Sequence, residues 1–187
     1  MKKYDIVILH GTGGSPDGNW FPWLREQLTA RGHRVFVPRF PTPDEQSVET
    51  WNRALKEQVP QIGSNTILIG HSCGATYILH ILESLENPVH ASILVSGFID
   101  KLGNEWFDIR NETFVNHKFD WEKIKKNAGR VTLLAGDNDP YVPASAARKL
   151  ADALSAQLTI IPGGGHLNSE FGYTEFPEIL KIVETAQ

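Results

Sequence analysis

Cysteine, long apolar runs and blocks of like charge are scarce or absent in this sequence of 187 residues. The only cysteine is Cys73, and a lone cysteine cannot form an intramolecular disulfide, so nothing indicates a secreted, disulfide-stapled protein. No stretch approaches the roughly 18 consecutive apolar residues of a membrane-spanning helix. We therefore expect a cytoplasmic protein without a membrane partner.

Charges of the two signs are nearly balanced. Eighteen basic and 22 acidic residues give a formal net charge of −4, and neither sign is concentrated in one long run. Proteins that bind nucleic acid usually gather Lys and Arg in a patch or stripe, so we expect no nucleic-acid partner. Cysteine, histidine and carboxylate residues show no paired spacing typical of a metal site, and we expect neither a metal nor a cofactor.

Apolar residues, at 41% of the chain, are plentiful enough for one sizeable core. Area scaling indicates that a chain of this size buries about 70% of its surface on folding, and we predict one domain over residues 1–187. Six short runs are rich in Val, Ile and Leu, and most are continuously apolar, as in strands buried on both faces of a parallel sheet. These runs cover residues 5–10, 34–38, 66–70, 91–97, 131–136 and 158–162.

Segments with helical spacing separate the six runs. This alternation predicts a three-layer α/β/α fold with an open, mainly parallel sheet of about six strands and helices on both faces. Residues 100–120 have no strong period, and we interpret them as a short irregular insertion that is either functional or packed on the domain. Within it, Trp106 and Phe107 are candidate walls of an apolar substrate pocket.

The most specific motif is a G-x-S-x-G pentapeptide at residues 70–74, with Ser72 at its centre. It follows an apolar run directly and opens a segment with a clear helical stripe, which is the strand–turn–helix setting of a nucleophile elbow. In that turn the serine hydroxyl stands above the sheet edge, next to a helix N-terminus that favours negative charge. An ordinary βα turn with Ser72 as a helix cap has the same local pattern.

A catalytic serine needs a base that is oriented by a carboxylate. Asp137 and Asp139 follow the fifth run, and His166 follows the sixth after three glycines. Since each follows the carboxyl end of a predicted parallel strand, these residues and Ser72 should meet at one sheet edge. Spacing alone does not separate the two aspartates; we assign the acid to Asp139 and retain Asp137 as the alternative.

A glycine-rich loop, His10-Gly11-Thr12-Gly13-Gly14, follows the first run. An oxyanion hole needs two backbone N–H donors, and we assign them to Cys73 and Thr12. The rival interpretation, a dinucleotide-binding loop, is disfavoured because Pro16 stands at the third glycine position and no acidic residue ends the second run.

Together these motifs resemble the α/β-hydrolases, specifically the small single-domain serine hydrolases related to retinoblastoma-binding protein 9. The resemblance covers almost the full length and includes His10-Gly11, the pentapeptide at 70–74 and Gly165-His166. It implies Ser72 as nucleophile, Asp139 as acid and His166 as base, and a sheet without the first two strands of larger hydrolases. The L-x-C-x-E motif for binding a pocket protein is missing, so we expect no such partner.

The predicted function is that of a serine hydrolase of carboxylesterase type, which cleaves an ester or similar activated acyl substrate through an acyl-enzyme. Its partner is then a small-molecule acyl substrate. The alternative is a non-catalytic protein-interaction module that keeps a hydrolase scaffold. Because only residues 100–120 are left to cover the site, we expect a shallow, partly open site.

Overall fold

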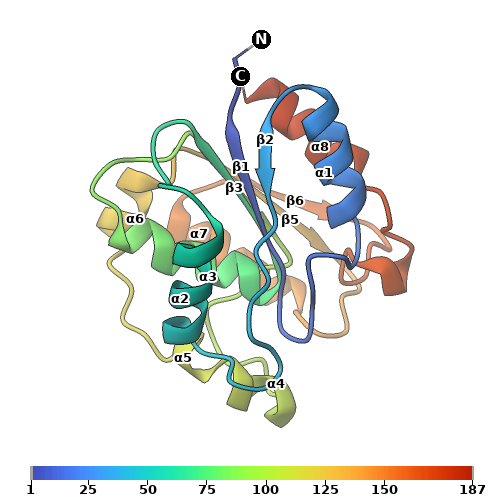
Figure 1. Cartoon of the computed structure of the whole chain (residues 1–187). Coiled ribbons are helices and arrows are strands. Elements are labelled where there is room, and N and C mark those ends of the chain that lie inside the picture. The colour runs from blue at the N-terminus through green and yellow to red at the C-terminus, as the bar shows by residue number, and fades with distance from the viewer. Residues whose placement is uncertain (1, 187) are drawn as a thin grey trace.

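One open sheet of six parallel strands forms the centre of the computed structural model, which describes residues 2–186 (Figure 1). In sheet order the strands are β2 (Arg34–Phe36), β1 (Asp5–Leu9), β3 (Thr66–His71), β4 (Ala91–Val95), β5 (Arg130–Gly136) and β6 (Leu158–Ile161). All five neighbouring pairs are parallel. The predicted fold class is confirmed, and each predicted run matches one strand to within two residues at either end.

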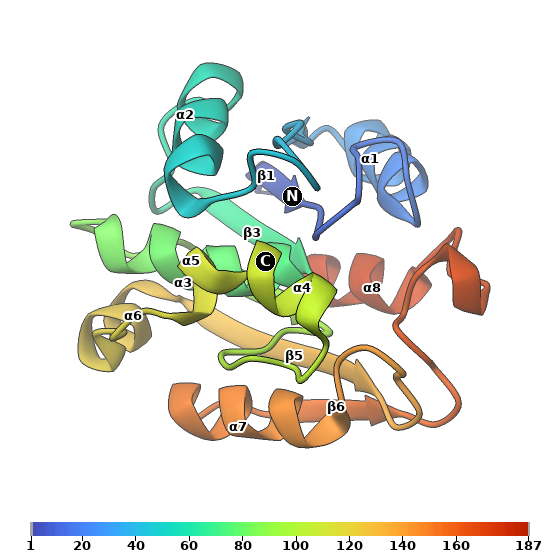
Figure 2. The same cartoon turned by 90° about the horizontal axis from the view of Figure 1, so that it is seen from below.

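Helices cover both faces of the sheet. One layer contains α1 (Phe21–Ala30) and α8 (Pro177–Thr185), and the other contains α2 (Val48–Gln58), α3 (Cys73–Ser84), α6 (Trp121–Asn127) and α7 (Ala144–Leu154) (Figure 2). Alternate residues of β1 point to opposite layers: Val7 packs in the core with α2 and α3, whereas Ile6 and Ile8 pack with α1 and α8. This double burial explains why the strand sequences are continuously apolar.

The segment at residues 100–120 differs from the expectation of an irregular stretch. It contains two short helices, α4 (Glu105–Arg110) and α5 (Glu112–Val115), which lie beyond the carboxyl ends of the strands (Figures 1 and 2). The side-chain oxygen of Asn104 caps α4 by accepting from the N–H groups of Trp106 and Phe107. Helices this short complete too few turns to give a readable 3.6-residue period. We call residues 100–120 the cover segment.

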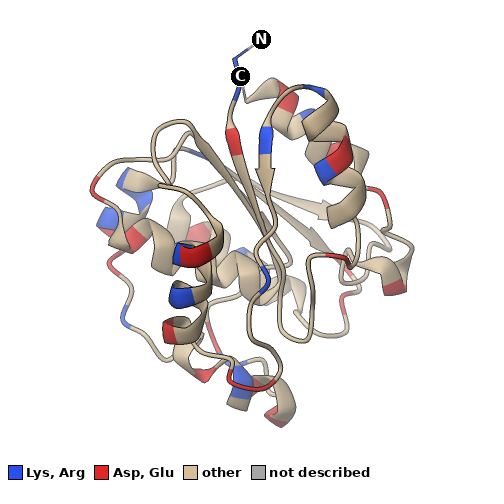
Figure 3. Cartoon of the chain, viewed as in Figure 1, with Lys and Arg blue, Asp and Glu red and all other residues tan. Residues whose placement is uncertain are grey.

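Charged residues of both signs are interleaved along the helices and loops of the ribbon (Figure 3). Within the part of the chain that the structure describes, no helix combines the length and the apolar content that crossing a bilayer requires.

Candidate active site

Ser72 lies in a strained turn between the last residue of β3 and the first residue of α3. Its φ of 56° and ψ of −125° are a conformation that residues with side chains rarely adopt. A Cβ at Gly70 or Gly74 would collide with backbone atoms of the adjoining helix or of β1, so glycine is required at both flanks. The residue types around Ser72 therefore allow the close packing that holds this turn, and the serine side chain remains half-buried.

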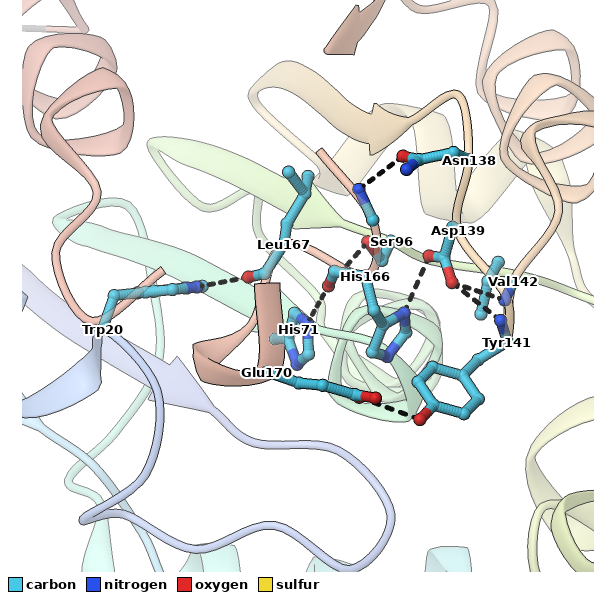
Figure 4. A network of polar contacts seen from close by, with 11 residues as sticks. Trp20, His71, Ser96, Asn138, Asp139, Tyr141, Val142, His166, Leu167 and Glu170 are labelled. Atoms are coloured by element: carbon cyan, nitrogen blue, oxygen red, sulfur yellow. Dashed lines mark hydrogen bonds and ion pairs between the residues drawn. The ribbon is translucent and has the colours of Figure 1, made fainter. Parts of the chain in front are cut away.

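Asp139 and His166 form a buried pair. Oδ2 of Asp139 lies 2.7 Å from Nδ1 of His166, and the two side chains are 0% and 8% exposed (Figure 4). The other carboxylate oxygen, Oδ1, accepts from the backbone N–H groups of Tyr141 at 2.9 Å and Val142 at 3.0 Å. Because an ionised carboxylate only accepts hydrogen bonds, Nδ1 carries the ring proton and Nε2 keeps its lone pair.

The alternative acid, Asp137, has a different contact. It is exposed, and its Oδ1 accepts from the N–H of Gly163 at 2.8 Å. Its neighbour Asn138 accepts from the N–H of Gly165 at 2.7 Å. Asp137 and Asn138 thus shape the glycine loop that precedes His166, whereas Asp139 contacts the imidazole itself.

His71, directly before Ser72, holds the backbone of His166. Its Nε2 lies 2.9 Å from the carbonyl oxygen of His166, and the two rings pack edge to face with centroids 4.7 Å apart. Burial, reinforced by the neighbouring His166, lowers the pKa of His71 to about 3. His71 is therefore neutral at pH 7 and donates through Nε2. Ser96 donates to the same carbonyl at 3.3 Å (Figure 4).

The Ser72 hydroxyl and the His166 ring share no hydrogen bond within residues 2–186. The shared contact with His71 nevertheless places His166 beside the turn that carries Ser72. Tyr141 borders the His166 ring at a centroid distance of 5.2 Å, and its hydroxyl contacts Glu170 at 2.8 Å.

The glycine-rich loop at residues 10–14, which we call the oxyanion loop after the role predicted for it from the sequence, packs against this turn. A Cβ at Gly11 would lie 2.8 Å from Cβ of Ser72 and 3.3 Å from the backbone nitrogen of Cys73. His10 fixes the loop because its Nε2 accepts from the N–H of Phe40 at 3.1 Å, which leaves Nδ1–H to donate to the Gly11 carbonyl at 3.0 Å. Burial lowers the pKa of His10 and favours this neutral form.

Gln46 is a residue of the site that the sequence analysis missed. Its side-chain nitrogen lies 2.9 Å from Oγ1 of Thr12 and 2.8 Å from Oδ1 of Asn111, and the Thr12 hydroxyl also donates to Asn111 at 2.6 Å. Its side-chain oxygen accepts from the Thr42 hydroxyl, which in turn accepts from the N–H of Gly13 at 2.7 Å. Gln46 thereby ties the oxyanion loop to the cover segment. It belongs to no sequence motif.

Cys73 contributes no exposed thiol. It is fully buried, and burial raises the pKa of its thiol, so the sulfur stays protonated at neutral pH. Only its backbone N–H, at the start of α3, is available for the role predicted from the sequence, that of an oxyanion-hole donor.

The cover segment borders the site through α4. The Phe107 ring packs against Tyr141 at a centroid distance of 5.8 Å, and Tyr141 packs on His166. Trp106 is 44% exposed, and its ring end would lie 3.9 Å from a Cβ at Gly13 in the oxyanion loop. The guanidinium of Arg110 stacks over Trp106 at 4.1 Å. Both predicted wall residues therefore lie near the candidate active site.

A parallel sheet with a serine at a strained strand–helix turn, and with an Asp–His pair in the loops beyond the same sheet edge, defines an α/β-hydrolase. A family model described as serine hydrolase matches residues 6–185, and the chain belongs to this family.

Similar proteins support the assignment. The chain is 32% identical over 180 residues to YdeN of Bacillus subtilis, with 95% of this chain and 93% of YdeN covered. It is 30% identical over 182 residues to the serine hydrolase RBBP9 of Rattus norvegicus, with coverage of 96% and 93%. The crystal structure of the B. subtilis ydeN gene product superposes with a TM-score of 0.90 at 30% identity, and 98% of each chain is covered. The resemblance inferred from the sequence is confirmed.

Proposed function

We propose that this protein is a carboxylesterase-type enzyme that cleaves a small ester or similarly activated acyl substrate, with Ser72, His166 and Asp139 as its catalytic triad. The observation that carries this proposal is the buried Asp139–His166 pair beside the strained serine turn. Membership of the serine hydrolase family supports the reaction class.

In the proposed reaction, Nε2 of His166 removes the proton of the Ser72 hydroxyl as Oγ attacks the carbonyl carbon of the substrate. The tetrahedral intermediate collapses, the alcohol leaves with the proton from His166, and an acyl-enzyme remains. Water then attacks the acyl group with His166 again as base, which releases the acid and restores Ser72. Asp139 holds the imidazole through Nδ1 and stabilises its charged form.

The backbone N–H groups of Thr12 and Cys73 are assigned as the donors that bind the developing oxyanion. Cys73 is the first residue of α3, and the N-terminus of a helix favours negative charge. Close contact between the oxyanion loop and the serine turn supports this assignment, because both donors must converge on one oxygen. Preorganised donors of this kind are worth about 10²- to 10³-fold in kcat each. The bonds between Gln46, Thr12 and Asn111 supply the preorganisation on the Thr12 side.

The substrate is proposed to lie between the oxyanion loop and α4, with Trp106 and Phe107 as apolar walls. Trp106 is exposed enough to contact a ligand, and Phe107 reaches the site through Tyr141. A cover of two short helices leaves little depth for a long acyl chain, so short or exposed acyl groups fit best.

Labelling with a fluorophosphonate probe, followed by mass spectrometry, tests the proposal. We expect modification of Ser72 in the folded wild-type protein and none in Ser72→Ala. The matched control is Ser84→Ala, at the other end of the same helix, which should label like the wild type. Turnover should then be measured on p-nitrophenyl esters of increasing acyl length. An unlabelled Ser72 in folded protein, together with no turnover, would overturn the mechanism and favour an interaction module.

A further inference from the structure

A second cluster of chemically capable side chains lies away from the sheet edge, where the middle of α3 meets the chain after α5. It consists of His80 and Glu83 on α3 and His117 beyond α5, and their potential ligand atoms lie within 4.8 Å of one another. His80 and Glu83 share one helix face because they are three residues apart. We propose that these three side chains bind a divalent transition-metal ion, with Zn²⁺ as the ion that best fits the donors.

His80 has one ring nitrogen held by the backbone and one that is free to bind a metal. Its Nε2 lies 2.9 Å from the carbonyl oxygen of Phe114, so Nε2–H donates and the lone pair of Nδ1 stays free. Histidines that bind metals commonly donate their other ring N–H to a backbone carbonyl in this way, which fixes the ring and raises its basicity.

Glu83 and His117 supply the other two donors. One carboxylate oxygen of Glu83 accepts from the N–H of Asp120 at 2.6 Å, which orients the group, and the other lies 2.6 Å from Nε2 of His117. A metal ion would take the place of the hydrogen that Nε2 of His117 donates to this oxygen. Ligand atoms around a tetrahedral Zn²⁺ are about 3.3 Å apart, so shifts on the order of 1 Å would close the site. The partly exposed His117 side chain has room to make them.

The donor set determines the kind of ion. Two imidazole nitrogens and one carboxylate oxygen, with water in the fourth position, suit Zn²⁺ and its transition-metal neighbours, whereas Mg²⁺ and Ca²⁺ prefer oxygen ligands alone. The sequence analysis expected no metal because it found no paired spacing typical of a metal site. Glu83 and His117 are 34 residues apart and share no motif. A bound ion would fasten the end of the cover segment to α3 and stabilise the folded state.

The test uses the full-length protein without an affinity tag, stripped of metal by a chelator. Zn²⁺ and Co²⁺ are titrated in by calorimetry and visible absorption. We expect one ion per chain, a tetrahedral Co²⁺ spectrum that Zn²⁺ abolishes, a rise in melting temperature with Zn²⁺, and no response to Mg²⁺. Failure of both ions to bind stoichiometrically would overturn the proposal.

Two conservative variants locate the site. His117→Gln changes a partly exposed side chain, and Glu83→Gln keeps an oxygen for the N–H of Asp120, so both should fold. Each should weaken Zn²⁺ binding at least about tenfold, since even loss of an outer-shell partner costs 10- to 100-fold. Glu86→Gln, an exposed carboxylate near the end of α3, is the control and should bind like the wild type. Binding that is unchanged in His117→Gln, or is lost in His166→Gln instead, would place the ion elsewhere. Neither result bears on Ser72 labelling, so this proposal stands or fails separately.

Discussion

Ser72 approaches Gly11 so closely that residue 11 has no room for a side chain. The position of a Cβ at residue 11 lies 2.8 Å from Cβ of Ser72 and 3.0 Å from the carbonyl oxygen of His71, so there is no space for a methyl group. This close approach joins the oxyanion loop and the serine turn into one unit. The geometry of the proposed oxyanion hole therefore depends on the absence of a side chain at residue 11.

Gly11→Ala should lower kcat/KM at least about tenfold, because the methyl group displaces the oxyanion loop from the serine turn and misplacement by 1 Å can cost about 10²-fold. Overpacking should also reduce the free energy of unfolding by about 1–3 kcal/mol. Ester hydrolysis and urea denaturation measure the two effects. Gly63→Ala is the matched control, because a Cβ there meets nothing within 4 Å. Wild-type activity in Gly11→Ala would contradict the assigned loop.

Asp139→Asn should lower kcat by about 10⁴-fold, the scale seen when a triad aspartate becomes an amide and the histidine takes the wrong tautomer. Asp137→Asn should retain activity within a few-fold, because an asparagine oxygen can still accept from the N–H of Gly163. Steady-state kinetics on one activated ester compare the two variants. If Asp137→Asn proved the more damaging, the acid would have to be reassigned.

Gln46→Ala should lower kcat about 10- to 100-fold while KM for a small ester changes little, because the alanine releases Thr12 without removing a substrate contact. Loss of the amide also leaves the buried Asn111 side chain with one partner fewer, at a cost of about 1–3 kcal/mol in the free energy of unfolding. Gln61→Ala, an exposed glutamine, is the control. An equal fall of kcat in both variants, or a rise in KM alone, would rule out a positioning role for Gln46.

The stability of the fold should decrease as the pH falls from 7 to 5. The pKa of His71 is about 3 in the folded protein and about 6.5 unfolded, so between these values the unfolded chain binds more protons. The contribution of His71 to the free energy of unfolding is complete above about pH 6.5 and is lost as the pH falls toward 3. His71 alone should remove about 2 kcal/mol between pH 7 and 5.

Urea denaturation at pH 7 and pH 5 measures this change. Burial also lowers the pKa of His10 and His80, which adds to the loss in the same direction. His71→Gln, compared with itself at the two pH values, should show a smaller decrease than the wild type. A wild-type stability that does not change over this range would contradict the buried neutral His71.

Short-range sequence patterns were enough to predict the strands and the serine turn. Each strand is apolar on both faces because helices cover both sides of the sheet. The continuously apolar sequence of a strand therefore reflects its burial directly. The glycines that flank Ser72 were recognised in the sequence as part of a motif. The structure explains them, because backbone atoms occupy the positions where their side chains would lie. The cover segment was not readable, because α4 and α5 are stabilised by a cap and by contacts to distant residues rather than by a long apolar stripe.

The sequence by itself determined the parallel sheet, the placement of Ser72, the two aspartates and His166 after strands, and the family, because these depend on local burial and on which residues follow each strand. Only the tertiary structure distinguished the contacts of Asp139 from those of Asp137, joined Gln46 to Asn111 across 65 residues, and brought His117 to Glu83 across 34 residues. The physical reason is the same in each case. A hydrogen bond between residues far apart in the chain forms only after the strands and helices have packed, and neither partner carries a local signal of it.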